Sequence, residues 1–150
     1  MVEQWIENPC VGGSIPPLDK VTFLNINLIM DNTTLYFLIK LKNFSVVNKF
    51  SFLVNFSSKI KNIVQVLYKF GIIQSYNSST NQIYLKKKPV FRNLEIISSP
   101  SNLRFLSFLE IARLQVSPTT IMIFSTNKGI LSNFECQEQG VGGVLLFILW

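Results

Sequence analysis

The sequence contains no histidine and only two cysteines, and this shortage excludes several kinds of active site. A tetrahedral zinc site needs four nitrogen or sulfur ligands, which two thiols cannot supply. Neither a Ser-His-Asp triad nor a Cys-His pair can form without an imidazole. We expect Cys10 and Cys136 to be free thiols, because nothing in the sequence marks a secreted, disulfide-bonded protein. We therefore expect no metal, no cofactor and no enzymatic activity.

The sequence also lacks an apolar run long enough to cross a membrane, although 48% of its residues are hydrophobic. Polar residues interrupt both of the most apolar runs, Val21–Met30 and Leu35–Leu41. The amino-terminal residues include Glu3 and Glu7, and they resemble neither a secretory signal nor an arginine-rich transit peptide. We expect no membrane span.

Carboxylates are absent from the middle of the chain. Residues 32–94 hold ten basic residues and no acidic one, whereas residues 1–31 carry a net charge of −3 and residues 95–150 one of −1. The values +10, −3 and −1 give the +6 of the whole chain. An ordinary solvated surface mixes both signs, so the acid-free stretch indicates an anionic partner. Nucleic acid is favoured over a membrane, since no basic amphipathic helix with a broad apolar face stands out.

Hydrophobic periodicity and turn residues predict an α+β protein with two small subdomains. We expect an N-terminal extension over residues 1–30, an α-β-α-β-β subdomain over residues 31–90, and a mostly β subdomain with a short helix over residues 91–150. In the first part we expect, in order, a strand over Val21–Met30, a helix over Thr33–Phe44 capped by Asp31 or Asn32, a strand over Phe50–Phe56, a helix from Ser57 or Ser58 to Gly71, and a hairpin of Ile72–Tyr76 and Gln82–Lys87.

The second subdomain is predicted from shorter apolar runs and clearer turn signals. Its expected elements are strands over Arg92–Ser98 and Leu103–Leu106, a helical turn at Glu110–Leu114, strands over Ile121–Phe124 and Ile130–Leu131, a helix capped by Ser132 and closed by Gly140–Gly143, and a strand over Val144–Trp150.

Two motifs in the last third carry the most information. Ser125-Thr126-Asn127-Lys128-Gly129 follows an apolar strand, and Gly140-Val141-Gly142-Gly143 follows the short helix. Hydroxyl donors, a lysine and a glycine that lets the main chain come close are suited to holding a phosphate backbone. The same residues also suit an ordinary hairpin turn, which is the commoner role of such a sequence.

The order of these pieces favours the binding role. This order resembles that of the carboxyl-terminal domain of small-subunit ribosomal protein eight: a strand, a Ser-Thr-x-Lys-Gly turn, a short strand, a short helix, Gly-x-Gly-Gly and a final strand ending in Trp. The similarity extends upstream to about residue 32, through Ser57–Ile73, Leu38–Asn43 and Ile97–Pro100. The resemblance implies a structural protein that binds an irregular helix in the central domain of small-subunit rRNA and supports subunit assembly and translation. Its other partners would be neighbouring small-subunit ribosomal proteins, and it would not form a homo-oligomer.

The resemblance also implies an RNA-binding surface, carried over position by position. Its residues in the C-terminal half are Ser125, Thr126, Asn127, Lys128, Gly129, Gly140, Gly142 and Gly143, and its basic positions in the N-terminal half are Lys40, Lys42, Lys59 and Lys61. We add Lys86, Lys87 and Lys88, because three adjacent lysines repel one another and must point into solvent or at anions. The chain departs from the family at Val144, where a glutamate is usual, and at the short helix, which is usually basic.

The choice of residues favours an organellar protein. Thirteen phenylalanines, many asparagines, isoleucines and lysines, and no histidine are typical of an AT-rich gene. We expect the protein in the mitochondrial matrix, on the mitochondrial ribosome, with a plastid as the second choice. Two other functions stay open: a hydrophobic assembly subunit of an organellar complex without RNA binding, and an enzyme that binds an anion at the glycine loop.

Overall fold

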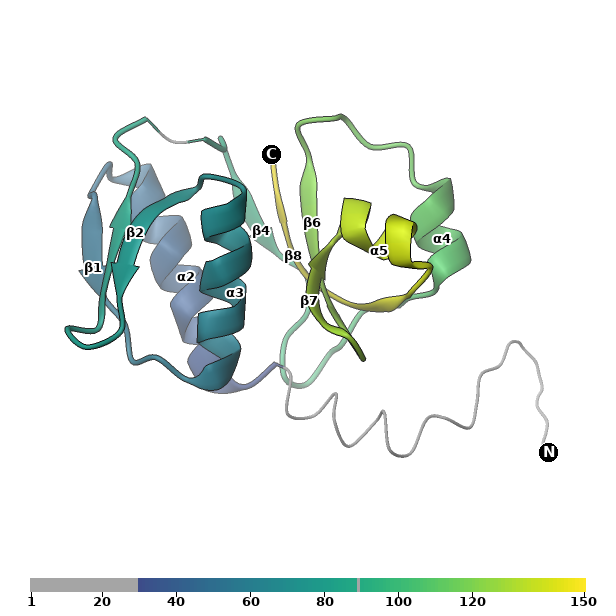
Figure 1. Cartoon of the computed structure of the whole chain (residues 1–150), viewed down its shortest axis with the longest axis horizontal. Helices are drawn as coiled ribbons and strands as arrows, with labels where there is room; N and C mark the ends of the chain where they lie inside the picture. The colour runs from purple at the N-terminus through teal and green to yellow at the C-terminus, as the bar shows by residue number, and fades with distance from the viewer. Residues whose placement is uncertain (1–29, 89) are drawn as a thin grey trace.

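A computed structural model describes residues 30–88 and 90–150 of the chain. Two lobes lie side by side (Figure 1): one packs two helices on a three-stranded sheet, and the other is a five-stranded antiparallel sheet with two short helices. The α+β fold class is confirmed. The extension, and all of the predicted strand over Val21–Met30 except its last residue, lie outside the described residues.

The first lobe begins with two helices that start at the predicted caps. Helix α2 (Asn32–Val46) is capped by Asp31, and helix α3 (Ser58–Lys69) is capped by Ser57. Helix α2 runs two residues past the predicted end at Phe44, since Asn48 ends it in the left-handed region at φ 54°. The Asn48 N–H donates to the Ser45 carbonyl (3.4 Å) and the Lys49 N–H to the Phe44 carbonyl (3.0 Å), the two bonds of a Schellman motif.

The sheet of this lobe has the order β1-β3-β2 and is antiparallel throughout. Strands β1 (Ser51–Leu53) and β3 (Gln82–Leu85) are shorter than predicted, whereas β2 (Ile73–Asn77) has the predicted length and is shifted by one residue. The wider prediction for β1, Phe50–Phe56, was wrong at both ends because only Ser51–Leu53 pair with β3. The apolar stripe of α3, with Ile60, Ile63, Val64 and Leu67, is fully buried, as its spacing predicted.

The second lobe is built around its last strand. Strand β8 (Gly143–Leu149) pairs with β4 (Leu94–Ile96) and β5 (Phe105–Leu106) along one edge and with β6 (Ile121–Thr126) along the other. Strand β7 (Gly129–Ser132) continues the sheet beyond β6. The strand predicted over Arg92–Ser98 was too long, because the Arg92 and Asn93 N–H groups both donate to the Trp150 carbonyl outside the ladder.

Helices α4 (Phe108–Arg113) and α5 (Asn133–Gln139) each begin with a capping box. In α5 the Ser132 hydroxyl accepts the Glu135 N–H (3.3 Å) while the Glu135 carboxylate accepts from Ser132, as the sequence predicted. Helix α4 starts two residues before the predicted turn at Glu110–Leu114, since Ser107 caps it in the same way.

One apolar core runs through both lobes. Leu38 and Val64 from the helices of the first lobe belong to the same buried cluster as Ile123, Leu146 and Phe147 of the second. A smaller cluster lies under α4 and α5 and includes the buried thiol of Cys136, which forms no disulfide. Burial and the nearby carboxylate of Glu135 raise the pKa of this thiol to about 11. None of the helices within residues 30–88 and 90–150 has both the length and the apolar character needed to cross a membrane.

Candidate RNA-binding surface

The turn between β6 and β7 is a tight hairpin. Thr126 pairs with Gly129, so Asn127 and Lys128 form the exposed tip. The Thr126 hydroxyl donates to the Gly129 carbonyl (2.9 Å) and accepts the Lys128 N–H (3.1 Å), and Gly129 has φ 113°, a value that side chains disfavour. Since Thr126 holds the turn together, the groups at the tip that can reach a phosphate are the side chains of Lys128 and Asn127.

The glycine loop packs directly against this hairpin. A Cβ on Gly143 would collide with the Ser125 carbonyl oxygen and lie 2.8 Å from the Thr126 Cγ2. Gly142 is equally confined, since its Cβ would lie 2.6 Å from the carbonyl oxygen of Leu106, at the end of β5. The two motifs, separated in sequence, therefore meet at one end of the second sheet. Gly142 and Gly143 are required there because their main chain lies directly against the main chain of β5 and β6, which leaves no room for a side chain.

Gly140 has a different role. It follows the last residue of α5 in the left-handed conformation at φ 67°, and a Cβ there would meet nothing within 4 Å. It acts as an αL helix cap and leaves the surrounding backbone exposed. The glycine loop thus combines one open residue with two that are closely packed.

The two departures from the family pattern fall on structural positions. Val144 is 1% exposed and belongs to the core that joins the two lobes, where a glutamate would need a partner. In α5, Glu135 closes the capping box and also pairs with Lys69 of α3 at 2.8 Å. Burial alone would raise the pKa of Glu135, but hydrogen bonds from Lys69 and Ser132 outweigh it and lower the pKa. The ionised carboxylate neutralises one of the ten bases of the acid-free stretch.

The predicted lysines of the first helices have partners in the protein or lie in the open. Lys40 donates to the Leu53 carbonyl (2.9 Å), and Lys59 pairs with the Asp31 carboxylate at 3.0 Å. Burial alone would raise the pKa of Asp31, but hydrogen bonds from Thr34 and Lys59 lower it. Lys42 is half-buried, and Lys61 is exposed on α3. Lys40 and Lys59 are therefore engaged within the protein, and of these four lysines Lys61 is the exposed one.

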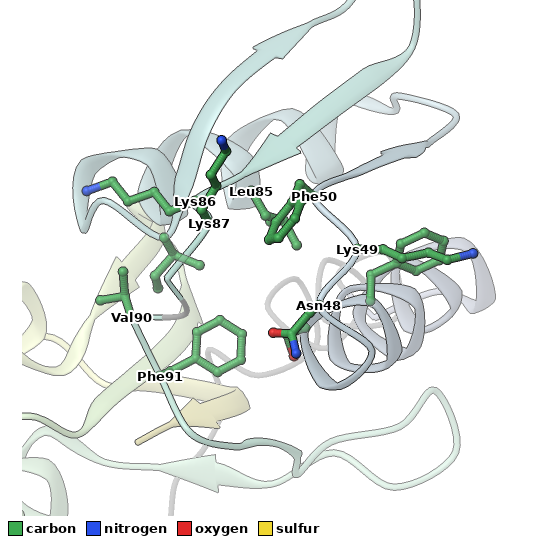
Figure 2. Close-up of a pocket in the computed structure, with 11 residues that line it drawn as sticks. Asn48, Lys49, Phe50, Leu85, Lys86, Lys87, Val90 and Phe91 are labelled. Atoms are coloured by element: carbon green, nitrogen blue, oxygen red, sulfur yellow. The ribbon is translucent and has the colours of Figure 1, made fainter.

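The lysine run lies beyond the end of β3. Lys86, Lys87 and Lys88 are exposed, and Figure 2 shows the first two pointing in different directions beside a shallow hollow. Lys49, from the loop after α2, lies on the opposite side of the same hollow. We did not predict Lys49 from the sequence as a site residue; its ammonium lies over the Phe44 ring, 6.0 Å from the centroid.

The residues that the structure describes contain no group of three cysteine, aspartate or glutamate side chains able to hold a metal ion. The arrangement on these residues is one of exposed cations, exposed backbone and tight turns. Such groups are suited to contacting a phosphate backbone.

Comparison with known proteins identifies relatives of the chain. The ribosomal protein S8 family matches residues 33–150. The small ribosomal subunit protein uS8c of Tetradesmus obliquus is 29% identical over 137 residues, which cover 81% of this chain and 100% of that protein. The uS8c protein of Tupiella akineta is 36% identical over 100 residues, covering 60% of this chain and 76% of its own length.

The relatives come from more than one kind of ribosome. The uS8m protein of Acanthamoeba castellanii is 32% identical over 92 residues, covering 57% of this chain and 72% of its own length. A bacterial relative, uS8 of Dictyoglomus thermophilum, is 30% identical over 122 residues, covering 75% of this chain and 92% of its own length. Plastid, mitochondrial and bacterial ribosomal proteins are thus all similar to this chain. The S8 family consists of structural ribosomal proteins, so the match confirms the expectation that the chain is not an enzyme. Because the family match spans both lobes, the chain belongs to the ribosomal protein S8 family.

Proposed function

We propose that this protein is a structural component of the small ribosomal subunit that binds the central domain of small-subunit rRNA and supports assembly and translation. The observation that carries the proposal is the meeting of the β6–β7 hairpin with the glycine loop. Lys128 is exposed at the tip of that hairpin, and the open cap at Gly140 lies in the adjoining loop.

This surface suits double-stranded RNA. An RNA duplex hides its base edges in a deep groove, so proteins contact its phosphates and 2′-hydroxyls and read its shape. A rigid turn with a lysine at its tip can contact a phosphate at a fixed position, and exposed backbone amides can donate to phosphate oxygens. We propose Ser125, Thr126, Asn127, Lys128, Gly129, Gly140, Gly142 and Gly143 as this surface. Ser125 and Thr126 are buried, at 5% and 9% exposure, and with Gly142 and Gly143 they maintain the shape that the exposed groups present.

We further propose that the two halves, residues 31–90 and 91–150, contribute differently. The first supplies positive charge through Lys40, Lys42, Lys59, Lys61 and the run Lys86–Lys88, and the second supplies the shaped contact. Lys59 already pairs with Asp31, so its contribution to RNA binding should be smaller than that of the exposed Lys61.

The test is RNA binding as a function of salt. We expect the protein to bind a duplex from the central domain of small-subunit rRNA, with a log–log salt slope of roughly 0.7–0.9 for each phosphate neutralised. It should also sediment with small subunits in a ribosome gradient. A slope near zero together with sedimentation away from the subunits would refute the proposal.

The compartment is a separate part of the proposal. The composition leads us to propose the mitochondrial ribosome, with the plastid ribosome as the second choice. Antibody detection in gradients of ribosomes from purified mitochondria and plastids distinguishes the two. Presence in the plastid gradient alone would overturn the first choice.

The amino-terminal extension is proposed to contact a neighbouring ribosomal protein. Its net negative charge disfavours a phosphate backbone, while Trp5, Ile6 and Val11 offer apolar anchors. Deleting residues 1–29 should leave the affinity for naked rRNA unchanged and weaken incorporation into the subunit. A large loss of affinity for naked rRNA would show instead that the extension belongs to the RNA-binding surface.

A further inference from the structure

A shallow hollow lies in the first lobe, at the junction of the end of α2, the loop into β1 and the segment after β3. Its apolar floor includes Phe50, Leu85 and Phe91, and we call it the Phe50 hollow. The β6–β7 hairpin contributes none of its lining residues, so it is a separate feature of the surface.

Phe50 gives the hollow an open aromatic face. Phe50 is 43% exposed, whereas Phe91, which also lines the hollow, is only 8% exposed. An exposed phenylalanine in a basic, acid-free surface presents a flat ring on which a nucleic-acid base can stack, and such stacking depends little on which base it is.

Asn48 supplies the polar group of the hollow. Figure 2 shows its side-chain amide directed toward the Phe91 ring, on the edge of the hollow nearest the end of α2. An amide offers both a donor and an acceptor, as recognition of a base edge requires. No hydrogen bond to this amide is formed by the other residues that the structure describes.

The surroundings of the hollow are positively charged. Lys49, Lys86 and Lys87 line it, and in Figure 2 their ammonium groups point outward on different sides. No acidic residue lines the hollow. Flexible lysine stems can reach phosphates on either side of a base without a fixed geometry.

From these observations we propose that the Phe50 hollow binds one unpaired nucleotide of RNA, with the base against Phe50, its edge at Asn48 and the flanking phosphates at the three lysines. The proposal rests on the proposed RNA-binding function and adds a second contact, to a bulged or looped base, to the duplex contact of the hairpin. A peptide with acidic and apolar residues is the other partner that such a surface could take. The Asn48 amide and the open ring favour the nucleotide.

The experiment uses two RNA duplexes of equal length, fully paired or with one bulged nucleotide carrying 2-aminopurine. Phe50→Ala should weaken binding of the bulged RNA roughly 5- to 100-fold, as expected when one stacked base loses its ring, and leave binding of the paired RNA unchanged. Asn48→Gly removes the amide and keeps the left-handed backbone that ends α2, so it should weaken bulged binding roughly 5-fold without lowering the melting temperature. Phe50→Tyr is the matched control that retains a ring.

The outcomes separate this proposal from the previous one. Lys128→Ala should weaken binding of both RNAs, whereas the two hollow variants should affect only the bulged RNA and abolish the stacking-induced fall in 2-aminopurine emission. If the unmodified protein binds neither RNA, both proposals fail. If it binds both RNAs equally and the hollow variants change neither affinity, the hollow is not a nucleotide site. If those variants nevertheless weaken entry of the protein into the subunit, the hollow binds a peptide instead.

Discussion

In the N-terminal half the predicted site residues are lysines with long side chains, four of which are exposed, whereas in the C-terminal half the two predicted motifs pack against each other. Lys86 to Lys88 and Lys61 are exposed on flexible stems. Thr126 and Gly143, by contrast, are fixed by hydrogen bonds or by backbone contact. The difference indicates that charge and shape are supplied by different parts of one protein, and four experiments can test this division.

The largest effect is expected at Gly143. A valine there would collide with the Ser125 carbonyl, so Gly143→Val should lower the free energy of unfolding by about 3 kcal/mol. Urea unfolding measures this change. Gly140→Asn is the control, since the site is open and asparagine tolerates a positive φ, so its cost should stay under about 1 kcal/mol. Equal stability of the two variants would show that the close approach of the two backbones is unnecessary.

The next effect concerns the hairpin tip. Lys128→Ala should weaken binding to the matched rRNA duplex by about 1.5–3 kcal/mol, the range for a hydrogen bond to a charged group. Its unfolding should be unchanged because the side chain is exposed. Fluorescence anisotropy measures the affinity, with Lys61→Ala as an exposed lysine outside the turn for comparison. Binding equal to that of the unmodified protein would mean that the hairpin serves the fold alone.

A smaller and less specific effect is expected from the lysine run. Replacing Lys86, Lys87 and Lys88 with glutamine should reduce the salt slope by up to about 0.7–0.9 for each phosphate that is no longer neutralised. The affinity for matched and unrelated duplexes should fall by the same factor, because a mobile point charge does not read shape. Titrations of both duplexes at several salt concentrations test this. If the variant lost affinity for the matched duplex more than for the unrelated one, the lysine run would supply specificity, contrary to the proposed division of roles.

The smallest effect links stability to pH. Folding lowers the pKa of Asp31 from 3.8 and the pKa of Glu135 from 4.5. Each ionised carboxylate therefore contributes its full stabilisation of the folded state at pH values above the unfolded-state pKa. That contribution is lost as the pH falls through the lowered folded-state pKa. Since both ion pairs are partly exposed, we expect less than about 1 kcal/mol from each. Urea midpoints at pH 6 and pH 3 should differ less in Glu135→Gln than in the unmodified protein. An unchanged difference would show that this pair contributes nothing.

The features that could be predicted from the sequence are those set by neighbouring residues. The caps at Asp31, Ser57 and Ser132 depend on a hydroxyl or carboxylate within one turn. The sequence predicted Ser132 outright and limited each of the other two caps to two neighbouring residues, one of which is the cap. The ends of β1 and β4 were not predicted correctly, because the extent of a strand depends on which residues pair with a partner strand, and partners far along the chain leave no local signal.

The candidate site divides in the same way. The hairpin around Lys128 was recognisable from its turn residues and their order. The reason for Gly142 and Gly143 was not, since it lies in contacts with β5 and β6 that only the tertiary structure reveals. The partners of Lys59 and Lys69 were also hidden, because Asp31 and Glu135 lie 28 and 66 residues away along the chain.

The position of β8 has a consequence for how the protein is made. This strand is the last element in chain order, yet it lies between β6 on one side and β4 and β5 on the other. During synthesis those strands emerge from the ribosome before their shared partner does, so the second sheet can be completed only once residues 143–149 have emerged. A nascent chain stalled before Gly143 would expose the apolar faces of three strands, and it would be a substrate for chaperones and proteases rather than a partner for RNA.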